Sequence, residues 1–219
     1  MSNRPYLLFL GISVVQLVSI LLGWNEIAFW SKCFLIPSLI VGVFNTLQRK
    51  EPAFYTVLSA LCFSTLGDVL LLFDSKSALF FFAGLGSFLI AQIFYIITFF
   101  RMSNKPYPSR VGWLYLFVFV ILLAILYPGM PMSMKIPVTA YGFCLTMMSL
   151  NSWRMYSMDH SVGLLIGVGS ILFMVSDSVL AIGKFKWELP YGHFIVMVTY
   201  ILAQYLLASG LVRMVNSKS

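Results

Sequence analysis

Long apolar segments alternate with short polar ones along the whole chain. Each apolar segment has about 20 residues, enough for a helix to cross the hydrocarbon core of a bilayer. Charged residues, glycine and proline cluster in the short segments between them. The expected spans are residues 5–23, 29–47, 53–73, 78–100, 110–127, 134–151, 161–182 and 191–213. The pattern therefore predicts an all-α polytopic membrane protein with eight transmembrane helices, in which residues 1–219 form a single transmembrane domain.

The composition supports a membrane protein. The chain is 60% hydrophobic and 10% charged, and its mean hydropathy is +0.94, outside the usual range of a soluble domain. Residues 5–23 lack the small-residue cleavage site of a signal peptide, so we interpret them as the first span. The three cysteines, Cys33, Cys62 and Cys144, lie in apolar segments without CxxC spacing, which indicates buried thiols and no disulfide framework.

The basic residues favour one side of the membrane. With eight spans, both termini and the second, fourth and sixth connections share a side that carries nine basic residues, against five on the other. The nine are Arg4, Arg49, Lys50, Arg101, Lys105, Arg110, Arg154, Arg213 and Lys218. The positive-inside rule then predicts cytoplasmic termini, and the compact chain favours a bacterial inner membrane. The basic residues form no patch interleaved with aromatic residues, so nucleic acid is not an expected partner.

Two acidic residues, Asp68 and Asp177, lie inside expected spans, at similar depths in the outer half. A charged group there costs roughly 3 kcal/mol or more on insertion scales, which favours a functional role. Desolvation favours the neutral form of a carboxyl, and two nearby carboxyls tend to share a proton, as an acid and a base do. The structural alternative is that each aspartate bonds Ser64, Thr65 or a tyrosine or glutamine of a neighbouring helix.

The surroundings of the two aspartates resemble each other. They are 177 − 68 = 109 positions apart, about half the chain, and the segments FSTLGDVLLLF and FMVSDSVLAI around them are similar. Tyr95 and Gln204 each follow the respective aspartate by 27 residues, in the next span. These features are consistent with a four-plus-four pseudo-repeat, although two apolar helices can also look alike by chance.

Further polar residues point to the same outer half of the membrane. His193, Tyr200 and Gln204 are spaced by seven and four, which places them on one face of the last span. They would line a wet pocket, or bond neighbouring helices while His193 anchors the span at the interface. Lys32 and Lys184 are expected at headgroup height, where they would meet a phosphate or only extend along the lipid surface.

Several chemistries lack the residues that they need. His160 and His193 have no second ligand at the spacing of a zinc site, so we expect no metal. The chain has no GxSxG elbow, no P-loop and no GxGxxG motif after a strand, and we expect no cofactor.

Five segments, taken together, resemble the YhhN family of membrane proteins, whose characterised members are lysoplasmalogenases. They are GDVLLLF from residue 67, FFAGLGSFLIAQIFY from 81, PVTAY from 137, LFMVSDSVLAIGKF from 172 and VMVTYILAQYLLASG from 196. The resemblance runs in order from about Lys32 to Gly210. It implies an eight-helix membrane hydrolase that cleaves the vinyl ether bond of lysoplasmalogens. The products would be a fatty aldehyde and glycerophosphoethanolamine or glycerophosphocholine.

The resemblance also implies roles for particular residues. Asp68 and Asp177 would be the catalytic acid and base, in an order that the sequence leaves open. Tyr141, Tyr200 and Gln204 would position the water or the ether oxygen, and Lys32 and Lys184 would bind the phosphate. The partners are then a lysophospholipid substrate and membrane lipid. The chain departs from the family pattern at Cys33, where many members have proline, and at Gln92, where histidine is common.

Two other classes of function stay open. A small proton-coupled transporter or channel would use the same two aspartates as proton or cation sites. Such a protein is expected to have spans broken near the midplane, whereas Pro37 and Pro137 are the only prolines well inside spans. A purely structural membrane partner would leave the two acidic residues unexplained. The sequence therefore favours an enzyme that opens to the outer leaflet.

Overall fold

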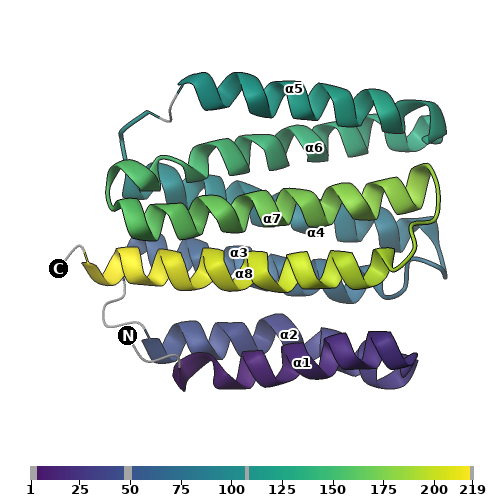
Figure 1. Cartoon of the computed structure of the whole chain (residues 1–219), viewed down its shortest axis with the longest axis horizontal. Helices are drawn as coiled ribbons and strands as arrows, with labels where there is room; N and C mark the ends of the chain where they lie inside the picture. The colour runs from purple at the N-terminus through teal and green to yellow at the C-terminus, as the bar shows by residue number, and fades with distance from the viewer. Residues whose placement is uncertain (1–3, 47–50, 107–108, 218–219) are drawn as a thin grey trace. The chain divides into compact units, whose positions relative to one another are not determined.

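The computed structural model describes residues 4–46, 51–106 and 109–217, with only the backbone for 109–111, and these ranges contain helices and no strand (Figure 1). The α-helices are α1 (Leu7–Leu22), α2 (Asn25–Thr46), α3 (Pro52–Leu71), α4 (Ala78–Met102), α5 (Ser109–Leu126), α6 (Met132–Ser152), α7 (His160–Phe185) and α8 (Gly192–Ser217). Three 3-10 turns accompany them: η1 (Arg4–Tyr6), η2 (Tyr127–Gly129) and η3 (Met155–Ser157). The all-α architecture is confirmed. Of the basic residues counted above, Arg49, Lys50 and Lys218 lie outside the described ranges.

Seven of the helices in these ranges, all but α6, are long and apolar enough to cross a membrane. Large apolar side chains cover their outer surfaces; Trp113 on α5 is 75% exposed and Leu79 on α4 is 73% exposed. The chain is therefore an integral membrane protein. The helix α6 is 21 residues long, but its serine, threonine and asparagine residues make it less apolar than the others.

Capping residues determine where several helices end and begin. Helix α1 ends at Gly23, whose φ of 71° is a left-handed conformation that glycine adopts without steric cost. The Trp24 N–H donates to the Ser19 carbonyl at 2.8 Å and closes this end. At the start of α7, the Asp159 Oδ1 accepts the Val162 N–H at 2.9 Å. These caps allow short connections between successive helices.

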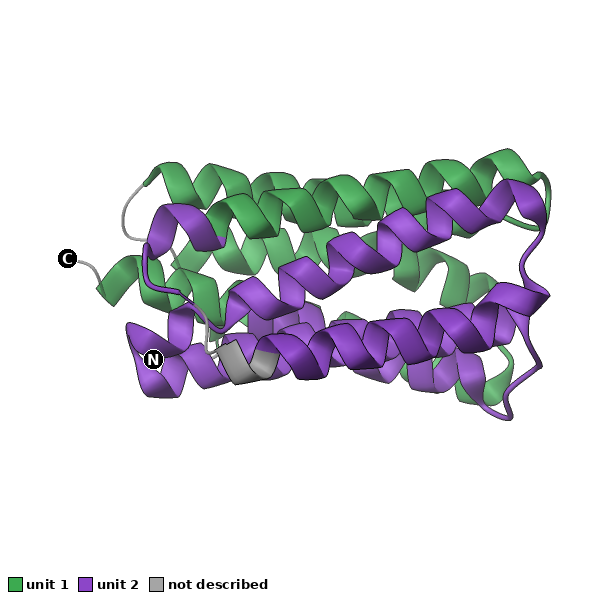
Figure 2. Cartoon of the chain, turned by 90° about the horizontal axis from the view of Figure 1, so that it is seen from above, with its two compact units in different colours: residues 1–98, 208–219 green, residues 99–207 purple. Residues whose placement is uncertain are grey.

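The chain divides into two compact units, shown in separate colours in Figure 2. Unit 1 comprises residues 1–98 and 208–219, which include α1, α2, α3, most of α4 and the end of α8. Unit 2 comprises residues 99–207, which include α5, α6, α7 and most of α8.

In unit 1, α3 and α4 pack closely as antiparallel neighbours. Near the start of α3, the Thr98 hydroxyl donates to Thr56 Oγ1 at 2.7 Å, and both side chains are buried. Near the end of α3, Gly67 lies against the Phe88 ring so closely that a Cβ atom there would be 2.6 Å from two ring carbons. These two contacts define the register of the helix pair.

In unit 2, buried polar groups and small residues join α6, α7 and α8. The Ser149 hydroxyl on α6 donates to the Ser170 carbonyl on α7 at 3.0 Å. At Gly169 on α7, a Cβ atom would lie 3.0 Å from the Leu206 Cβ and 3.1 Å from the Leu207 nitrogen on α8. Polar side chains of α6 are therefore used inside the unit, which accounts for its lower apolarity.

We expect Gly163→Ala to lower the free energy of unfolding by about 1–3 kcal/mol, the usual range for overpacking. A Cβ atom at this site would lie 2.3 Å from the backbone nitrogen and Cα of Tyr156, and backbone atoms cannot rotate away. In the same helix, a Cβ at Gly183 meets nothing within 4 Å, so Gly183→Ala is the control and should keep or improve stability. Unfolding in detergent measures both; equal stability of the two variants would contradict this packing.

Candidate functional site

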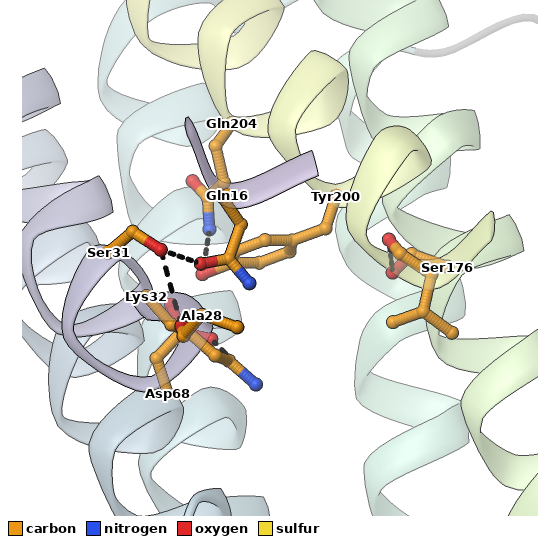
Figure 3. A network of polar contacts seen from close by, with 9 residues as sticks. Gln16, Ala28, Ser31, Lys32, Asp68, Ser176, Tyr200 and Gln204 are labelled. Atoms are coloured by element: carbon orange, nitrogen blue, oxygen red, sulfur yellow. Dashed lines mark hydrogen bonds and ion pairs between the residues drawn. The ribbon is translucent and has the colours of Figure 1, made fainter. Parts of the chain in front are cut away.

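One buried carboxyl lies in unit 1 beside a lysine. The Lys32 Nζ on α2 is 4.0 Å from the Asp68 Oδ1 on α3, and the two side chains are 13% and 5% exposed (Figure 3). A carboxylate in an apolar surrounding is strongly disfavoured unless a cation or hydrogen-bond donors compensate it. The nearby ammonium therefore favours the charged form of Asp68.

A second polar contact lies next to Lys32 and joins α1 to α2. The Ser31 hydroxyl is within 2.5 Å of the Gln16 Oε1, and the Gln16 side chain is fully buried (Figure 3). Among the described residues, the Gln16 Nε2 has no hydrogen-bond partner. This amide was not expected from the sequence, where a single glutamine inside residues 5–23 gave no signal of function.

An open groove of about 390 Å³ runs between α1 and α2 in unit 1. Its walls are mostly apolar, with Glu26 and Ser31 as the polar members; the lining residues are Ile12, Val15, Glu26, Ile27, Trp30, Ser31 and Phe34. Ser31, which lines the groove, directly precedes Lys32 in the sequence of α2. Apolar walls of this kind suit a hydrocarbon chain.

The second carboxyl lies in unit 2 and also has a partner on the preceding helix. The Tyr141 hydroxyl on α6 donates a hydrogen bond to the Asp177 Oδ2 on α7; Tyr141 is buried and Asp177 is half-buried. The neighbouring Ser176 hydroxyl donates to the Val196 carbonyl on α8 at 3.0 Å, which holds this turn of α7 against α8. Tyr141 and Asp177, which the family resemblance singles out separately, are thus in direct contact.

Tyr200 and Gln204 form a buried pair on α8 in the same unit. The Gln204 Nε2 donates to the Tyr200 hydroxyl at 3.2 Å, and the residues are 0% and 4% exposed, respectively (Figure 3). The Tyr200 ring meets the Phe173 ring edge-on, with centroids 5.8 Å apart. Since Phe173 precedes Asp177 by one helical turn, the pair lies about one turn along the bundle from that carboxyl.

Lys184 and His193 lie in more open positions. Lys184 is exposed in the last turn of α7, two turns beyond Asp177, and His193 is exposed in the first turn of α8. Both therefore belong to the end of unit 2 where α7 and α8 are connected. A cation at that position can meet an anionic headgroup.

The structural alternative for the aspartates can be compared with the observed bonds. The Ser64 hydroxyl, fully buried on α3, has no hydrogen-bond partner among the described residues, and Thr65 donates to the Leu61 carbonyl of its own helix at 3.0 Å. A tyrosine of a neighbouring helix does bond Asp177. The contact between Lys32 and Asp68 was missed, because the sequence suggested a headgroup position for that lysine.

In the described part of the chain, no three His, Cys, Asp or Glu side chains gather in a way that could hold a metal ion. The residues around Asp68 and Asp177 described above carry carboxyl, phenol, amide and ammonium groups. Together these groups can donate and accept protons and can bind an anion.

Comparisons of the sequence with known proteins find relatives that are named lysoplasmalogenase. The bovine (Bos taurus) protein named lysoplasmalogenase TMEM86A is 28% identical over 165 residues, which cover 72% of this chain and 65% of the bovine one. The human (Homo sapiens) protein named lysoplasmalogenase TMEM86B is 32% identical over 192 residues, 83% of this chain and 74% of the human one. This chain thus spans about two thirds to three quarters of these relatives.

No solved structure matches the chain significantly. A sequence model of the YhhN family, in contrast, matches residues 27–211, which include both aspartates and their partners. The chain belongs to the YhhN family.

Proposed function

We propose that this protein is a membrane lysoplasmalogenase, which hydrolyses the vinyl ether bond of lysoplasmalogens to a fatty aldehyde and a glycerophospho-headgroup. The observation that carries the proposal is that two carboxyls within the helices, Asp68 and Asp177, each have a specific partner on the preceding helix. Membership of the YhhN family and relatives that are named lysoplasmalogenase support the choice of reaction.

The reaction needs an acid and a base. Protonation of the β-carbon of the alkenyl ether gives an oxocarbenium ion, to which water adds at the α-carbon. The resulting hemiacetal then breaks into the aldehyde and the alcohol of the headgroup. One carboxylic acid supplies the first proton, while one carboxylate stabilises the cation and takes a proton from the water. As the hemiacetal breaks, the protonated base gives its proton to the leaving headgroup oxygen, and the ionised acid takes the proton of the hemiacetal hydroxyl. One water molecule is consumed in all, and both carboxyls return to their starting states.

The partners of the two carboxyls support an assignment of roles. Lys32 places an ammonium 4.0 Å from Asp68, which favours a carboxylate there. The reaction needs one group of each kind, so the acid role falls to Asp177, which accepts a hydrogen bond from the neutral Tyr141 phenol. We therefore assign the carboxylate role to Asp68 and the acid role to Asp177.

The remaining predicted residues bind the substrate in this proposal. The groove between α1 and α2 suits the long alkenyl chain. Lys184 would bind the phosphate, and Lys32 has three donors, so it can contact Asp68 and a phosphate oxygen together. Tyr141, Tyr200 and Gln204 would orient the water or the ether oxygen.

We further propose that all eight long helices span the membrane as two related groups of four. The spacing of 109 residues that separates the aspartates also separates their partners, since 141 − 32 = 109. The contact of Lys32 with Asp68 and that of Tyr141 with Asp177 therefore correspond position by position. A contact to each aspartate from the corresponding position of the preceding helix supports the repeat and a membrane-spanning α6.

The main rival is a proton-coupled transporter or channel that uses the same aspartates. It predicts no hydrolysis by purified protein in detergent, where no gradient exists.

The bacterial inner membrane, expected from the compact chain, stays a prediction about the location of the protein.

The first test is release of fatty aldehyde from a lysoplasmalogen by the purified protein. We expect Asp68→Asn and Asp177→Asn each to lower kcat by about 100-fold or more, because each removes a proton-transfer group. Asp74→Asn, the same change in the connection between α3 and α4, serves as the control and should keep full activity. Activity should also persist with a chelator, and a folded wild-type protein that releases no aldehyde would exclude the proposal.

Substitutions of Lys32 and Lys184 should affect different kinetic constants. Lys32→Met removes the cation beside Asp68 and is expected to lower kcat by roughly 10-fold or more. Lys184→Met removes an exposed phosphate contact and should raise KM by about 2- to 5-fold with kcat nearly unchanged. Steady-state rates over a range of substrate concentration measure both. Equal effects of the two substitutions on kcat would contradict the assigned roles.

The orientation predicts which connections are accessible from outside the cell. In a chain whose three native cysteines are replaced by alanine, we introduce Ser75→Cys between α3 and α4, or Asn104→Cys between α4 and α5; both sites are exposed. In intact bacterial cells, an impermeant maleimide should label the first but not the second. Opening the cells should allow labelling of both. The reverse pattern would place the termini outside.

A further inference from the structure

Two fully buried polar side chains of unit 1 have no hydrogen-bond partner among the described residues. They are Ser64 on α3 and Gln92 on α4, both 0% exposed. The atoms without a partner in these ranges are the Ser64 hydroxyl oxygen and, on Gln92, both the amide nitrogen and the amide oxygen. Buried polar atoms nearly always have a partner, either in the protein or in an ordered water molecule.

The packing of α3 against α4 brings these two residues to the same level. Thr56 bonds Thr98 at one end of the helix pair, and Gly67 touches Phe88 at the other. Between these contacts, and directly next to Ser64 in the chain, the Phe63 ring stacks on the Phe94 ring with centroids 5.7 Å apart.

The facing surfaces agree with this register. Ser64 follows Ala60 by one turn, and Gln92 follows Phe88 by one turn; all four residues are buried. In an antiparallel pair with the contacts above, Ser64 and Gln92 therefore oppose each other, although their polar atoms do not bond directly.

Their chemistry matches the requirements of a single water molecule. Such a molecule can accept a hydrogen bond from the Gln92 amide nitrogen and donate one to the amide oxygen, and it can bond the Ser64 hydroxyl in either sense. Buried waters typically make about three hydrogen bonds to groups that are otherwise unsatisfied.

The same position is within reach of the carboxyl in unit 1. Asp68 follows Ser64 by four residues on α3, and side chains at this spacing lie on one face of a helix, with Cβ atoms about 5–6 Å apart. A water molecule bonded to the Ser64 hydroxyl can therefore also bond the Asp68 carboxyl. Lys32 approaches the same carboxyl from α2.

We propose that Ser64 and Gln92 together hold a buried water molecule that hydrogen-bonds the Asp68 carboxyl, and that the two residues are positioning residues for the hydrolysis. This role rests on the proposed function, in which Asp68 is the carboxylate that takes a proton from the attacking water. The held water orients that carboxylate and replaces part of the hydration that it loses on burial.

A stability cycle tests the water site without reference to activity. If one water bridges the two residues, Ser64→Ala and Gln92→Met should each lower the melting temperature, and the double variant should be no less stable than the worse single one. If no water bridges them, removal of unpaired polar groups should raise the melting temperature or leave it unchanged. That second result, or strictly additive losses, would overturn the proposal.

Kinetics test the link to Asp68. We expect Ser64→Ala and Gln92→Met to lower kcat at least about 10-fold with KM within twofold of wild type. Ser64→Thr, which keeps the hydroxyl, should recover most of the rate. The control is Ser13→Ala, since the buried Ser13 hydroxyl donates to the Phe9 carbonyl of its own helix at 2.7 Å.

The two failures can be told apart. Folded variants that keep the wild-type kcat would overturn the positioning role while leaving the proposed hydrolysis intact. A wild-type protein that releases no aldehyde would instead remove the proposed function and the positioning role with it. The stability cycle would then still decide whether Ser64 and Gln92 hold a water molecule.

Discussion

A carboxyl group inside an apolar helix needs a charged or hydrogen-bonding partner, and this requirement organises both units of the protein. Lys32 on α2 forms an ion pair with Asp68 on α3, and Tyr141 on α6 donates a hydrogen bond to Asp177 on α7. In each case the partner comes from the helix immediately before, which a short connection keeps alongside. Each pair therefore depends on packing within its own unit. The partner on the preceding helix offsets part of the cost of burying the aspartate.

The close packing of small residues makes these contacts available. Gly67 directly precedes Asp68 and lets α3 approach Phe88 on α4, while Gly169 on α7 lets α8 approach in the other unit. Between apolar helices in lipid, close approach and internal hydrogen bonds replace the hydrophobic effect as the source of association. The residues that bring the helices together thus lie within two turns or so of the residues that carry the proposed chemistry.

The sequence predicts the helices better than it predicts their contacts. Long apolar runs require helices, because only a helix satisfies its own backbone in lipid, and a carboxyl such as Asp68 stands out in such a run. The partner of Asp68 depends on the register and facing of α2 and α3, which hydropathy does not encode. Lys32 was therefore expected at the headgroups, the amide of Gln16 gave no signal, and Gln92 was noted only as a departure from the family pattern. Tyr141 was named as a candidate site residue only through the family resemblance. The structure adds that its hydroxyl donates a hydrogen bond to Asp177.

Under the proposed function, the difference between the two corresponding contacts matters more than their similarity. Hydrolysis of a vinyl ether needs a proton donor and a proton acceptor at once, and two carboxyls in identical surroundings would have no fixed division of these roles. A lysine in one pair and a tyrosine in the other, at positions that correspond with an offset of 109 residues, break this symmetry. The Lys32 ammonium favours a carboxylate at Asp68, whereas the Tyr141 phenol is neutral. Two helix pairs with a lysine at one of these positions and a tyrosine at the other would in this way supply both an acid and a base.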